Sequence, residues 1–402
     1  MKPISNKEIV LGVTGSIAAY KACELASRLV ELGAKVTPVL TKSAAELVGP
    51  ATFEAITGRR AIMRMFEPMQ NPDIEHIAVA TRANLFLIAP ATANIIAKAA
   101  NGVADDWLST TLLATKAPVL FAPAMNTNMY NHPATQENIL KLRQRGCHFV
   151  GPDFGRLACG TVGPGRLIDP QAILEMSAVL LSEKRDLTGK RVLITSGATH
   201  EPIDPVRFIG NYSSGKMGRA LALEALSRGA VVTVISGPSS VTMPHSVLTL
   251  PVKTAVEMAE AVVSLSQDSD VFIGAAAVAD YRIEKPAQSK RKKSGKNLEL
   301  TLVENPDVLG LVSAVRRPEQ VIVGFAAETD DLLANAQVKL KKKNLDLIVA
   351  NEVDSEVSGF GKDTSKATLI AHDGTTEDLD VLSKADVAER IFDRIAALLA
   401  AR

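Results

Sequence analysis

Two stretches of this 402-residue chain carry the same alternation of a buried strand, a Gly-containing turn, a helix and a second strand. In the first, the apolar run 9–13 leads into a Gly/Ser turn, leucines follow at helical spacing, and 36–40 resumes as a strand. In the second, 192–195 is a predicted strand, 220–226 a helix and 231–235 the next strand. Because each pattern is a βαβ unit and the two begin about 180 residues apart, the sequence predicts two α/β domains.

The predicted boundaries follow from the same pattern. A chain of this length is expected to hold two domains at roughly 100–200 residues each. The first covers residues 1–181 and ends with the helix-like segment 170–181. A charged stretch, 182–190, is the predicted linker, and residues 191–402 form the second domain.

Composition excludes several classes of function. The chain has 45 Lys and Arg against 44 Asp and Glu, and only 4% aromatic residues, so neither a global basic field nor stacking platforms favour nucleic acid. No stretch approaches the roughly 18 uncharged apolar residues that a membrane span needs. The three cysteines, Cys23, Cys147 and Cys159, show no CxxC spacing, which argues against a disulfide framework or a zinc site and predicts a reducing cytoplasm.

The first turn of the chain favours a phosphate over a dinucleotide. The pattern Gly12-x-x-Gly15-Ser16 is too short for G-x-G-x-x-G, and no acidic residue follows at the expected distance. The hydroxyls of Ser16, Thr41 and Ser43 lie near predicted helix N-termini, where a single phosphate can bind. A tight turn with ordinary helix caps is the structural alternative.

A set of strings farther along the chain identifies a resemblance. His76 precedes a predicted strand, the strings APATAN (89–94) and PAMNTNM (123–129) follow, and Cys159 is followed by Gly160 and GPGR (163–166). In this order they resemble the flavin-dependent cysteine decarboxylases, from Gly12 to about Asp169. The resemblance implies a flavodoxin-like domain that binds FMN.

The resemblance also implies a chemistry and its residues. In that family FMN takes a hydride from the cysteine β-carbon, and the resulting thioaldehyde accepts the electrons released with CO2. His76 is then the acid/base, Asn126 binds the carboxylate, and Cys159 donates a proton from a Gly-rich flap, while Cys23 and Cys147 are expected to pack. The residues expected around FMN are Gly15, Ser16, Thr41, Pro90, Thr92, Asn94, Ser109 and Met125.

The second domain carries a sequence that imitates a P-loop. The segment 210–216 satisfies G-x-x-x-x-G-K, but Met217 stands where a Ser or Thr must bind magnesium, so a P-loop is disfavoured. Its glycines and hydroxyls still offer a helix N-terminus to an anion. Basic runs at 290–293 with Lys296, and at 339–343, indicate a polyanionic ligand such as a triphosphate, although solvated faces are the ordinary explanation for such runs.

Six strings between 189 and about 370 resemble the phosphopantothenate–cysteine ligases; they are TSGATHEPIDPVRFIGNYSSGKMG, GAAAVADYR, SKRKK, ENPDVL, VGFAAET and KKKNLDLIVAN. The fusion resembles the bifunctional enzymes of bacterial coenzyme A biosynthesis. This implies a Rossmann-like ligase domain in which CTP activates 4'-phosphopantothenate as an acyl-CMP and L-cysteine displaces CMP. The first domain then decarboxylates 4'-phosphopantothenoylcysteine to 4'-phosphopantetheine.

The ligase resemblance assigns residues as well. Lys290 and Asn211 are expected to be catalytic, Arg207 and Asn211 to bind phosphopantothenate, and Mg2+ or Mn2+ to assist, with its ligands left open. Asp280 has three open roles: a contact to the base, a contact to the ribose, or metal binding. The residues expected to bind CTP are Gly274, Ala275, Ala276, Asp280, Lys290, Pro306, Asp307, Val308, Leu309, Phe325, Lys339 and Lys343.

The resemblance further implies a homo-oligomer, a dodecamer of trimeric flavin domains and dimeric ligase domains, with no nucleic-acid or membrane partner. Two other classes of protein stay open from the residues alone. One is a flavin-binding regulatory subunit, against which His76 and Cys159 argue. The other is a nicotinamide oxidoreductase, against which the missing G-x-G-x-x-G argues.

Overall fold

The computed structural model describes residues 2–65, 75–292, 297–328, 332–352 and 361–402, and the chain forms two compact units that divide between Glu183 and Lys184. This division lies inside the predicted linker 182–190. Lys293 and Lys296 of the predicted basic run lie outside the described residues. Within the described part of the chain, no helix is long and apolar enough to cross a membrane.

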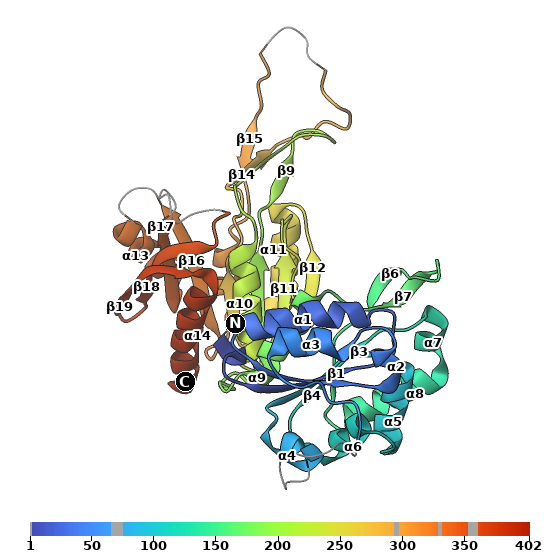
Figure 1. Ribbon diagram of the computed structural model, residues 1–402. Coiled ribbons are helices and arrows are strands. Elements are labelled where there is room, and N and C mark those ends of the chain that lie inside the picture. The colour runs from blue at the N-terminus through green and yellow to red at the C-terminus, as the bar shows by residue number, and fades with distance from the viewer. Residues whose placement is uncertain (1, 66–74, 293–296, 329–331, 353–360) are drawn as a thin grey trace. The chain divides into compact units, whose positions relative to one another are not determined.

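The first unit is built on five parallel strands in the order β2-β1-β3-β4-β5 (Figure 1). This is the strand order of flavodoxin-like folds and confirms the expected fold class. Both faces of the sheet are covered, so all seven residues of β3 are buried. The strands are β1 (Glu8–Val13), β2 (Lys35–Leu40), β3 (Leu85–Ala91), β4 (Val119–Pro123) and β5 (His148–Phe149).

Helices cover the two faces of this sheet. Helices α1, α3 and α9 pack on one face, while α4, α5, α6 and α8 pack on the other. Helix α1 buries Leu25 and Leu29, and Gly33, at a φ of 83°, follows its end. The helices are η1 (Lys2–Ile4), α1 (Ala19–Glu31), α2 (Lys42–Ala45), α3 (Pro50–Thr57), α4 (Glu75–Arg82), α5 (Ala93–Asn101), α6 (Trp107–Ala114), α7 (Thr127–Asn131), α8 (Pro133–Gln144) and α9 (Pro170–Leu181).

A separate antiparallel hairpin, β6 (Asp153–Arg156) with β7 (Val162–Arg166), carries the Gly-rich segment after Cys147. Gly165 has a φ of 137°, and a Cβ there would lie 2.2 Å from the Met125 carbonyl oxygen. The close approach therefore requires glycine, and it places the base of the hairpin against the end of β4.

The second unit has an eight-stranded sheet in the order β12-β11-β8-β13-β16-β17-β18-β19. Its first six strands are parallel and follow the Rossmann order 3-2-1-4-5-6, which confirms the expected fold class. Two antiparallel strands extend one edge. The strands are β8 (Arg191–Ser196), β11 (Val231–Ser236), β12 (Leu248–Pro251), β13 (Val271–Gly274), β16 (Val321–Glu328), β17 (Leu347–Glu352), β18 (Thr364–Ala371) and β19 (Thr376–Ser383).

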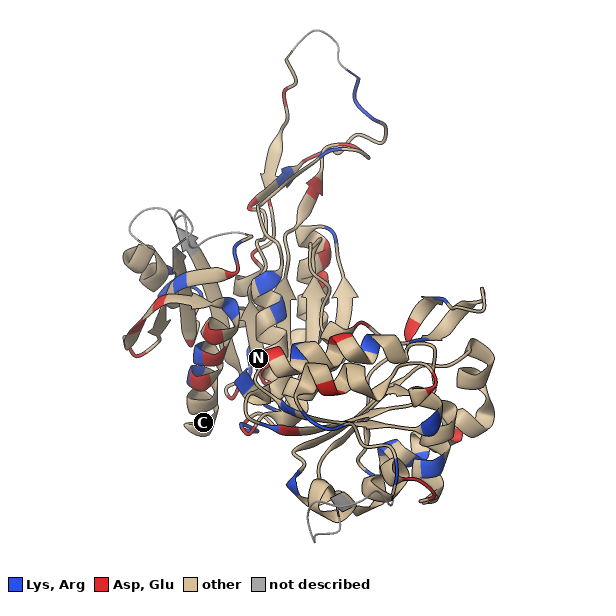
Figure 2. Ribbon diagram, in the orientation of Figure 1, with Lys and Arg blue, Asp and Glu red and all other residues tan. Residues whose placement is uncertain are grey.

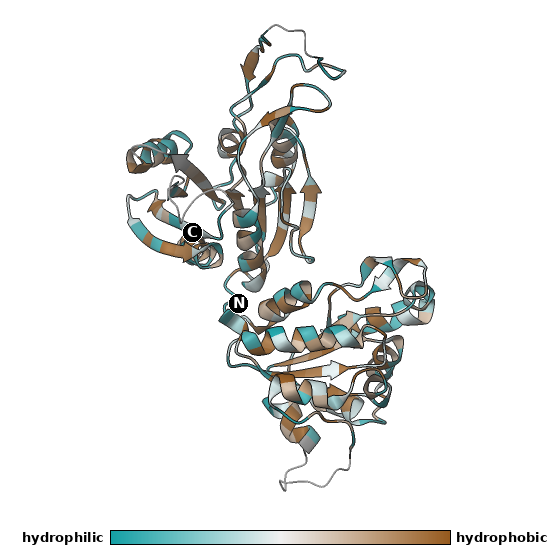
Figure 3. Ribbon diagram, turned by 45° about the horizontal axis from the view of Figure 1, so that its top comes forward, coloured by the Kyte–Doolittle hydropathy of each residue, from teal (hydrophilic) through white to brown (hydrophobic). Residues whose placement is uncertain are grey.

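Helices α10 and α14 cover one face of this sheet, and α11, α12 and α13 cover the other. Figure 3 shows the resulting pattern, with mainly hydrophobic residues along the central strands and both hydrophobic and hydrophilic residues along the helices. The helices are α10 (Lys216–Ser227), α11 (Ala255–Ser266), α12 (Val308–Ala314), α13 (Leu332–Lys342) and α14 (Lys384–Ala400).

Two short hairpins rise from one end of the second sheet (Figure 1). They pair β9 (His200–Pro202) with β10 (Phe208–Gly210), and β14 (Tyr281–Ile283) with β15 (Leu302–Glu304). In Figure 2, Lys and Arg positions are coloured along one branch of the long connection between β14 and β15. This connection holds Lys290.

Ion pairs of Arg228 join the first residues of the second unit to its helices. The Arg228 side chain is fully buried and forms ion pairs with Glu224 at 2.7 Å, Asp393 at 2.6 Å and Asp186 at 3.1 Å. Leu187 is also fully buried in the core beside α10 and α14. Residues 186–187 therefore pack as part of this unit.

Candidate active sites

The candidate residues of the first unit lie near its switch point, which is the place between β1 and β3 where the strand order reverses. Thr14, directly after β1, donates its hydroxyl to the Pro90 carbonyl at 2.7 Å and accepts from the Thr92 N–H at 3.0 Å. Thr92 also caps α5. In open α/β sheets, ligands bind in the crevice at such a point. Thr14 was absent from the predicted residues, although its place in the Gly12-to-Gly15 turn was a usable signal.

A corner suited to a phosphate lies beside this switch point. A Cβ on Gly15 would lie 2.4 Å from the Ser43 Cβ, so only glycine lets the turn come this close. Thr41 caps α2, and its N–H donates to the Val13 carbonyl at 3.0 Å. Helix α1 begins at Ala19 without a side-chain cap, which leaves its N-terminus open to an anion.

The Gly-rich hairpin brings Cys159 to Asn126. The Asn126 Nδ2 donates to the Cys159 Sγ at 3.3 Å, and the Asn126 side chain also caps α7. The neighbouring Met125 N–H donates to the Gly165 carbonyl at 2.9 Å, so the loop after β4 and the hairpin are joined twice. Two predicted catalytic residues, separated by 33 positions in the sequence, are therefore in contact.

Thr161 is a second partner of the thiol. Its Oγ1 lies 3.1 Å from the Cys159 Sγ, and hydrogen bonds from Thr161 and Asn126 hold the pKa of this thiol below its ordinary value. Burial instead raises the pKa of the Cys23 and Cys147 thiols, which pack at the edges of the cores. Thr161 is not among the residues predicted from the sequence, because nothing in the residue pattern distinguishes it from other threonines.

Three other predicted residues of this unit do not join that contact. His76 lies near the start of α4, which packs against α6, and within the described residues no hydrogen bond or ion pair links it to Asn126 or Cys159. In Figure 1, α4 and the β6–β7 hairpin lie at different ends of the unit. Ser109 is 2% exposed and forms a capping box with Asp106, whereas Asn94 is exposed on α5.

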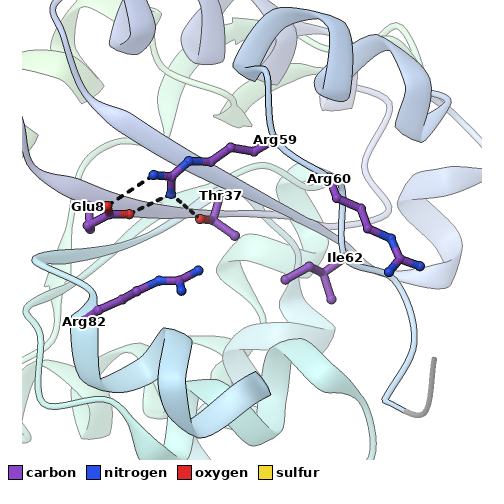
Figure 4. Close-up of a pocket in the computed structure, with 6 residues that line it drawn as sticks. All are labelled: Glu8, Thr37, Arg59, Arg60, Ile62 and Arg82. Atoms are coloured by element: carbon purple, nitrogen blue, oxygen red, sulfur yellow. Dashed lines mark hydrogen bonds and ion pairs between the residues drawn. The ribbon is translucent and has the colours of Figure 1, made fainter. Parts of the chain in front are cut away.

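A hollow of about 350 Å³ lies away from these residues, near the amino end of β1 (Figure 4). Its lining consists of Glu8, Thr37, Arg59, Arg60, Ile62 and Arg82. Arg59 donates to Glu8 at 2.6 Å and to the Thr37 hydroxyl at 3.1 Å, and it lowers the pKa of the Glu8 carboxyl. Because ligands collect at the carboxyl ends of strands in such sheets, this ion-paired hollow is separate from the candidate site.

The second unit closes its switch point, between β8 and β13, with a series of hydrogen bonds. The Thr195 hydroxyl accepts from Ala276 N–H at 3.3 Å, and the Thr199 hydroxyl accepts from Ala279 N–H at 2.9 Å. The Ala277 backbone adds bonds of 2.9 Å to Gly197 and 3.2 Å to Thr199. Gly274, Ala275 and Ala276, the predicted nucleotide residues, lie at this junction and are half-buried.

The start of α12 packs against the same junction. A Cβ on Gly274 would lie 2.9 Å from the Leu309 side chain, while Val308 is buried in the core. Asp307 caps α12 and forms an ion pair with Lys343. Lys339, on α13, donates to the Phe325 carbonyl at 2.8 Å. Pro306 precedes the cap and is half-buried.

The remaining ligase residues lie on or near the hairpins. The Asn211 Nδ2 donates to the Val278 carbonyl at 3.1 Å, which places it beside the switch point. Arg207 binds Asp204 and the Arg291 carbonyl. Lys290 is exposed in the connection between β14 and β15, and Asp280, exposed before β14, accepts from the Asn305 N–H at 2.8 Å through its carbonyl.

The P-loop imitation has an ordinary structural role. Helix α10 begins after Gly215, which has a φ of 77°, and no side chain caps it. The Lys216 ammonium bonds to the Asp363 carboxylate at 2.6 Å and to the Gly361 carbonyl at 2.9 Å. Among the described residues, no group of three or more His, Cys, Asp or Glu side chains is arranged to hold a metal ion.

Comparisons with known proteins match both units. The Flavoprotein family model matches residues 2–182, and the model of the DNA/pantothenate metabolism flavoprotein C-terminal domain matches residues 187–399. The coenzyme A biosynthesis bifunctional protein CoaBC of Bacillus subtilis (strain 168) is 47% identical over 399 residues, 98% of each chain. Its counterpart in Vibrio vulnificus (strain YJ016) is 44% identical over 401 residues, 99% of this chain and 100% of its own.

A solved structure, the C-terminal domain of a coenzyme A biosynthesis bifunctional protein CoaBC, is 37% identical and covers 55% of this chain and 100% of its own, with a TM-score of 0.47. The full-length relatives and the two family models together confirm the expected arrangement, a flavoprotein decarboxylase domain followed by a ligase domain. The chain belongs to the family of bifunctional enzymes of coenzyme A biosynthesis.

Proposed function

We propose that this chain converts 4'-phosphopantothenate, L-cysteine and CTP into 4'-phosphopantetheine in two steps. The second unit forms 4'-phosphopantothenoylcysteine through an acyl-CMP, and the first unit decarboxylates that product. Membership of the bifunctional family supports the pair of activities, and the contact between Asn126, after β4, and Cys159, on the β6–β7 hairpin, carries the residue assignment.

In the first unit the residues fit a flavin mononucleotide. The Gly15 turn, the hydroxyls of Ser16 and Thr41, and the uncapped N-terminus of α1 supply a site for its phosphate. Pro90 at the end of β3, Thr92 at the cap of α5 and Met125 after β4 are the proposed neighbours of the rest of the flavin. When bound, the flavin accepts a hydride from the cysteinyl group of the substrate and so makes loss of CO2 possible.

The protein groups of the first unit hold the substrate and move its protons. Asn126 donates a hydrogen bond to the substrate carboxylate, and His76 acts as acid/base near it. Cys159 protonates the substrate carbon in the final reduction, from a hairpin that already contacts Asn126. The presence of both His76 and Cys159 favours an enzyme over a flavin-binding subunit.

In the second unit the switch point binds the nucleotide. Gly274 brings the end of β13 close to the Leu309 side chain, and Ala275 and Ala276 follow it with small side chains. Lys339, Lys343 and Lys290 neutralise the phosphates, and Lys290 stabilises the charge that develops at the α-phosphorus. Arg207 and Asn211 bind phosphopantothenate, and Asn211 donates to the developing oxyanion. The rest of the proposed nucleotide site is Asp280, Pro306, Asp307, Val308, Leu309 and Phe325.

We propose that Mg2+ binds together with CTP. Magnesium usually takes one or two carboxylates and several oxygens from substrate phosphates or water. Asp280 is exposed close to the switch point and is available as such a carboxylate. Omission of Mg2+, with Mn2+ as the replacement, tests this assignment through the rate of pyrophosphate release.

The proposed assembly is a dodecamer of trimeric flavin units and dimeric ligase units. The separation of His76 from Cys159 within one chain supports a decarboxylase site completed by a neighbouring subunit. Light scattering of the purified protein measures the mass directly. A monomer at micromolar concentration contradicts this assembly.

One assay tests the function. Purified protein receives phosphopantothenate, cysteine and Mg2+ with either CTP or ATP, and mass spectrometry follows each intermediate. With CTP we expect the acyl-nucleotide, the ligated thiol and the decarboxylated thiol in that order; with ATP we expect none. Ligation with ATP overturns the nucleotide preference alone, whereas absence of both ligation and CO2 release overturns the proposal.

A further inference from the structure

The second unit buries a carboxylate that the proposed reaction does not use. Asp204 lies between β9 and β10, near the tip of their hairpin, and its side chain is fully buried although the loop around it is not. A buried charge is costly unless donors satisfy its oxygens. The groups that donate hydrogen bonds to Asp204 therefore identify the segments that it holds in place.

Five N–H groups converge on this carboxylate. Its Oδ1 accepts from the backbone N–H groups of Val206 and Arg207, both at 2.9 Å. Its Oδ2 accepts from Arg207 Nε at 3.0 Å and Nη2 at 2.5 Å, and from the Arg291 N–H at 3.2 Å. The Arg207 guanidinium and the backbone donors hold the pKa of Asp204 far below its usual value, so the group stays charged.

The Arg291 peptide is held from both sides. Asp204 accepts from its N–H, and Arg207 Nη2 donates to its carbonyl at 2.9 Å. The Ala287 N–H adds a bond of 3.0 Å to the Ile203 carbonyl. Because the Arg291 N–H belongs to the peptide bond that follows Lys290, this grip also fixes the backbone plane of Lys290.

The arrangement leaves the Lys290 side chain available. Lys290 is exposed, and no ion pair or hydrogen bond of its ammonium occurs within the described residues. Holding its backbone while its amine is unengaged reduces the entropy lost when the amine meets a phosphate. The same carboxylate orients Arg207, the proposed phosphopantothenate residue.

We propose that Asp204 is a positioning residue of the ligase reaction, which fixes Arg207 and the Lys290–Arg291 peptide together so that both cations face the activated carboxylate. The inference rests on the ligase function proposed above. It links two segments whose contacting residues, Asp204 and Arg291, are 87 positions apart in the sequence.

The test is Asp204→Asn in the full-length, flavin-loaded protein. Acyl-nucleotide formation is expected to fall about 10- to 100-fold, the range for loss of hydrogen bonds to charged groups. The KM for phosphopantothenate is expected to rise, while decarboxylation of supplied 4'-phosphopantothenoylcysteine stays unchanged. Asp373→Asn is the matched control, because Asp373 also accepts a backbone N–H in a turn of this unit but, within the described residues, has no hydrogen bond or ion pair with an arginine.

A double variant separates positioning from general structural damage. If Asp204 acts through Lys290, Asp204→Asn combined with Lys290→Gln loses no more than about twofold beyond Lys290→Gln alone. Losses that multiply, or a parallel loss of decarboxylation, overturn the proposal. The rate of the wild-type protein is measured first. If the wild-type protein makes no acyl-nucleotide, the proposed function is contradicted, but the hydrogen bonds that hold the Arg291 peptide are not.

Two further measurements test whether Asp204 holds the Arg291 peptide, even if the chain does not ligate or the variant does not fold. Hydrogen exchange of peptides that contain Arg291 is expected to accelerate in Asp204→Asn, whether or not the chain ligates; unchanged exchange overturns the grip. If that variant does not fold, Arg291→Pro removes the N–H from the exposed loop while the carboxylate remains. It is expected to slow acyl-nucleotide formation as strongly, and a wild-type rate contradicts the proposal.

Discussion

At the first unit's switch point Thr14 joins the ends of β1 and β3 through its hydroxyl, whereas among the described residues four hydrogen bonds join the ends of β8 and β13 in the second unit. The first site is covered by a hairpin whose Cys159 thiol contacts Asn126 directly. In the second, Lys339 and Lys343 already bind the Phe325 carbonyl and Asp307.

The difference follows from the chemistry that each site has to perform. A decarboxylase that moves a proton to carbon needs a donor brought close to substrate, and a hairpin pinned by Gly165 does that. A ligase that binds a triphosphate needs several cations kept apart until the ligand arrives, and internal acceptors of modest strength do that. Asn126 and Cys159 of the first unit touch one another, while Lys339 and Lys343 of the second are bound to groups of the protein itself.

The largest expected effect tests the independence of the two sites. Lys290→Gln removes the charge proposed at the α-phosphorus, so acyl-nucleotide formation is expected to fall about 10²- to 10³-fold. Decarboxylation of supplied 4'-phosphopantothenoylcysteine, followed by CO2 release, is expected to stay at the wild-type rate. Lys190→Gln, an exposed position before β8, is the control. Loss of both activities means that the sites are not separate.

Cys159→Ser tests the hairpin of the first unit. Serine keeps the size of the side chain but is a much weaker acid, so the final reduction is expected to slow about 100-fold while flavin absorbance is retained. Mass spectrometry should find an unsaturated thiol two mass units lighter than the product. Cys147→Ser, whose thiol packs at the edge of a core, should turn over normally. Full turnover by Cys159→Ser removes that residue from the reaction.

The sequence predicted the parts of these sites that depend on local pattern. Apolar runs that end in Gly-rich turns located the strands next to both switch points, because a parallel strand buried on both faces must be apolar and its ligand-binding turn must let backbone approach. The order of the motifs then predicted that Asn126 and Cys159 belong to the same site, and in the fold the two side chains are in contact.

The supports could not be predicted, because they depend on segments that only the fold brings together. Asp204 holds the Arg291 peptide across 87 positions, and Thr14 holds the end of β3 at Pro90 across 76. Asp204 stands inside a string that resembles the ligases and Thr14 inside the Gly12-to-Gly15 turn, yet neither position shows which segment its side chain contacts. Thr161 is near Cys159 in sequence, yet only the hairpin geometry turns its hydroxyl onto the thiol.

A smaller effect is expected when Lys343 of the second unit loses the carboxylate with which it forms an ion pair. Asp307→Asn keeps the cap on α12, since asparagine also accepts the Gly310 N–H, but it releases the Lys343 ammonium. The KM for CTP is expected to fall about 2- to 5-fold, the range for an exposed ion pair. Initial-rate kinetics of pyrophosphate release measures it, with Asp380→Asn on β19 as control. A raised KM means that Asp307 itself binds the nucleotide more strongly than it competes for Lys343.

The smallest expected effect concerns the thiol alone. Thr161→Val removes the hydroxyl that contributes most to lowering the Cys159 pKa, so that pKa is expected to rise toward its ordinary value. Because a thiolate is the species that reacts with iodoacetamide, the alkylation rate near neutral pH should then fall and its midpoint should move to higher pH. Thr188→Val removes a hydroxyl that bonds to the Arg185 carbonyl in the second unit, and it should leave the midpoint in place. An unmoved midpoint in Thr161→Val assigns the lowered pKa to the donors that remain, the backbone N–H of residue 161 and the Asn126 side chain. Asn126→Ala then separates these two, because it removes the side-chain donor that is also proposed to bind substrate.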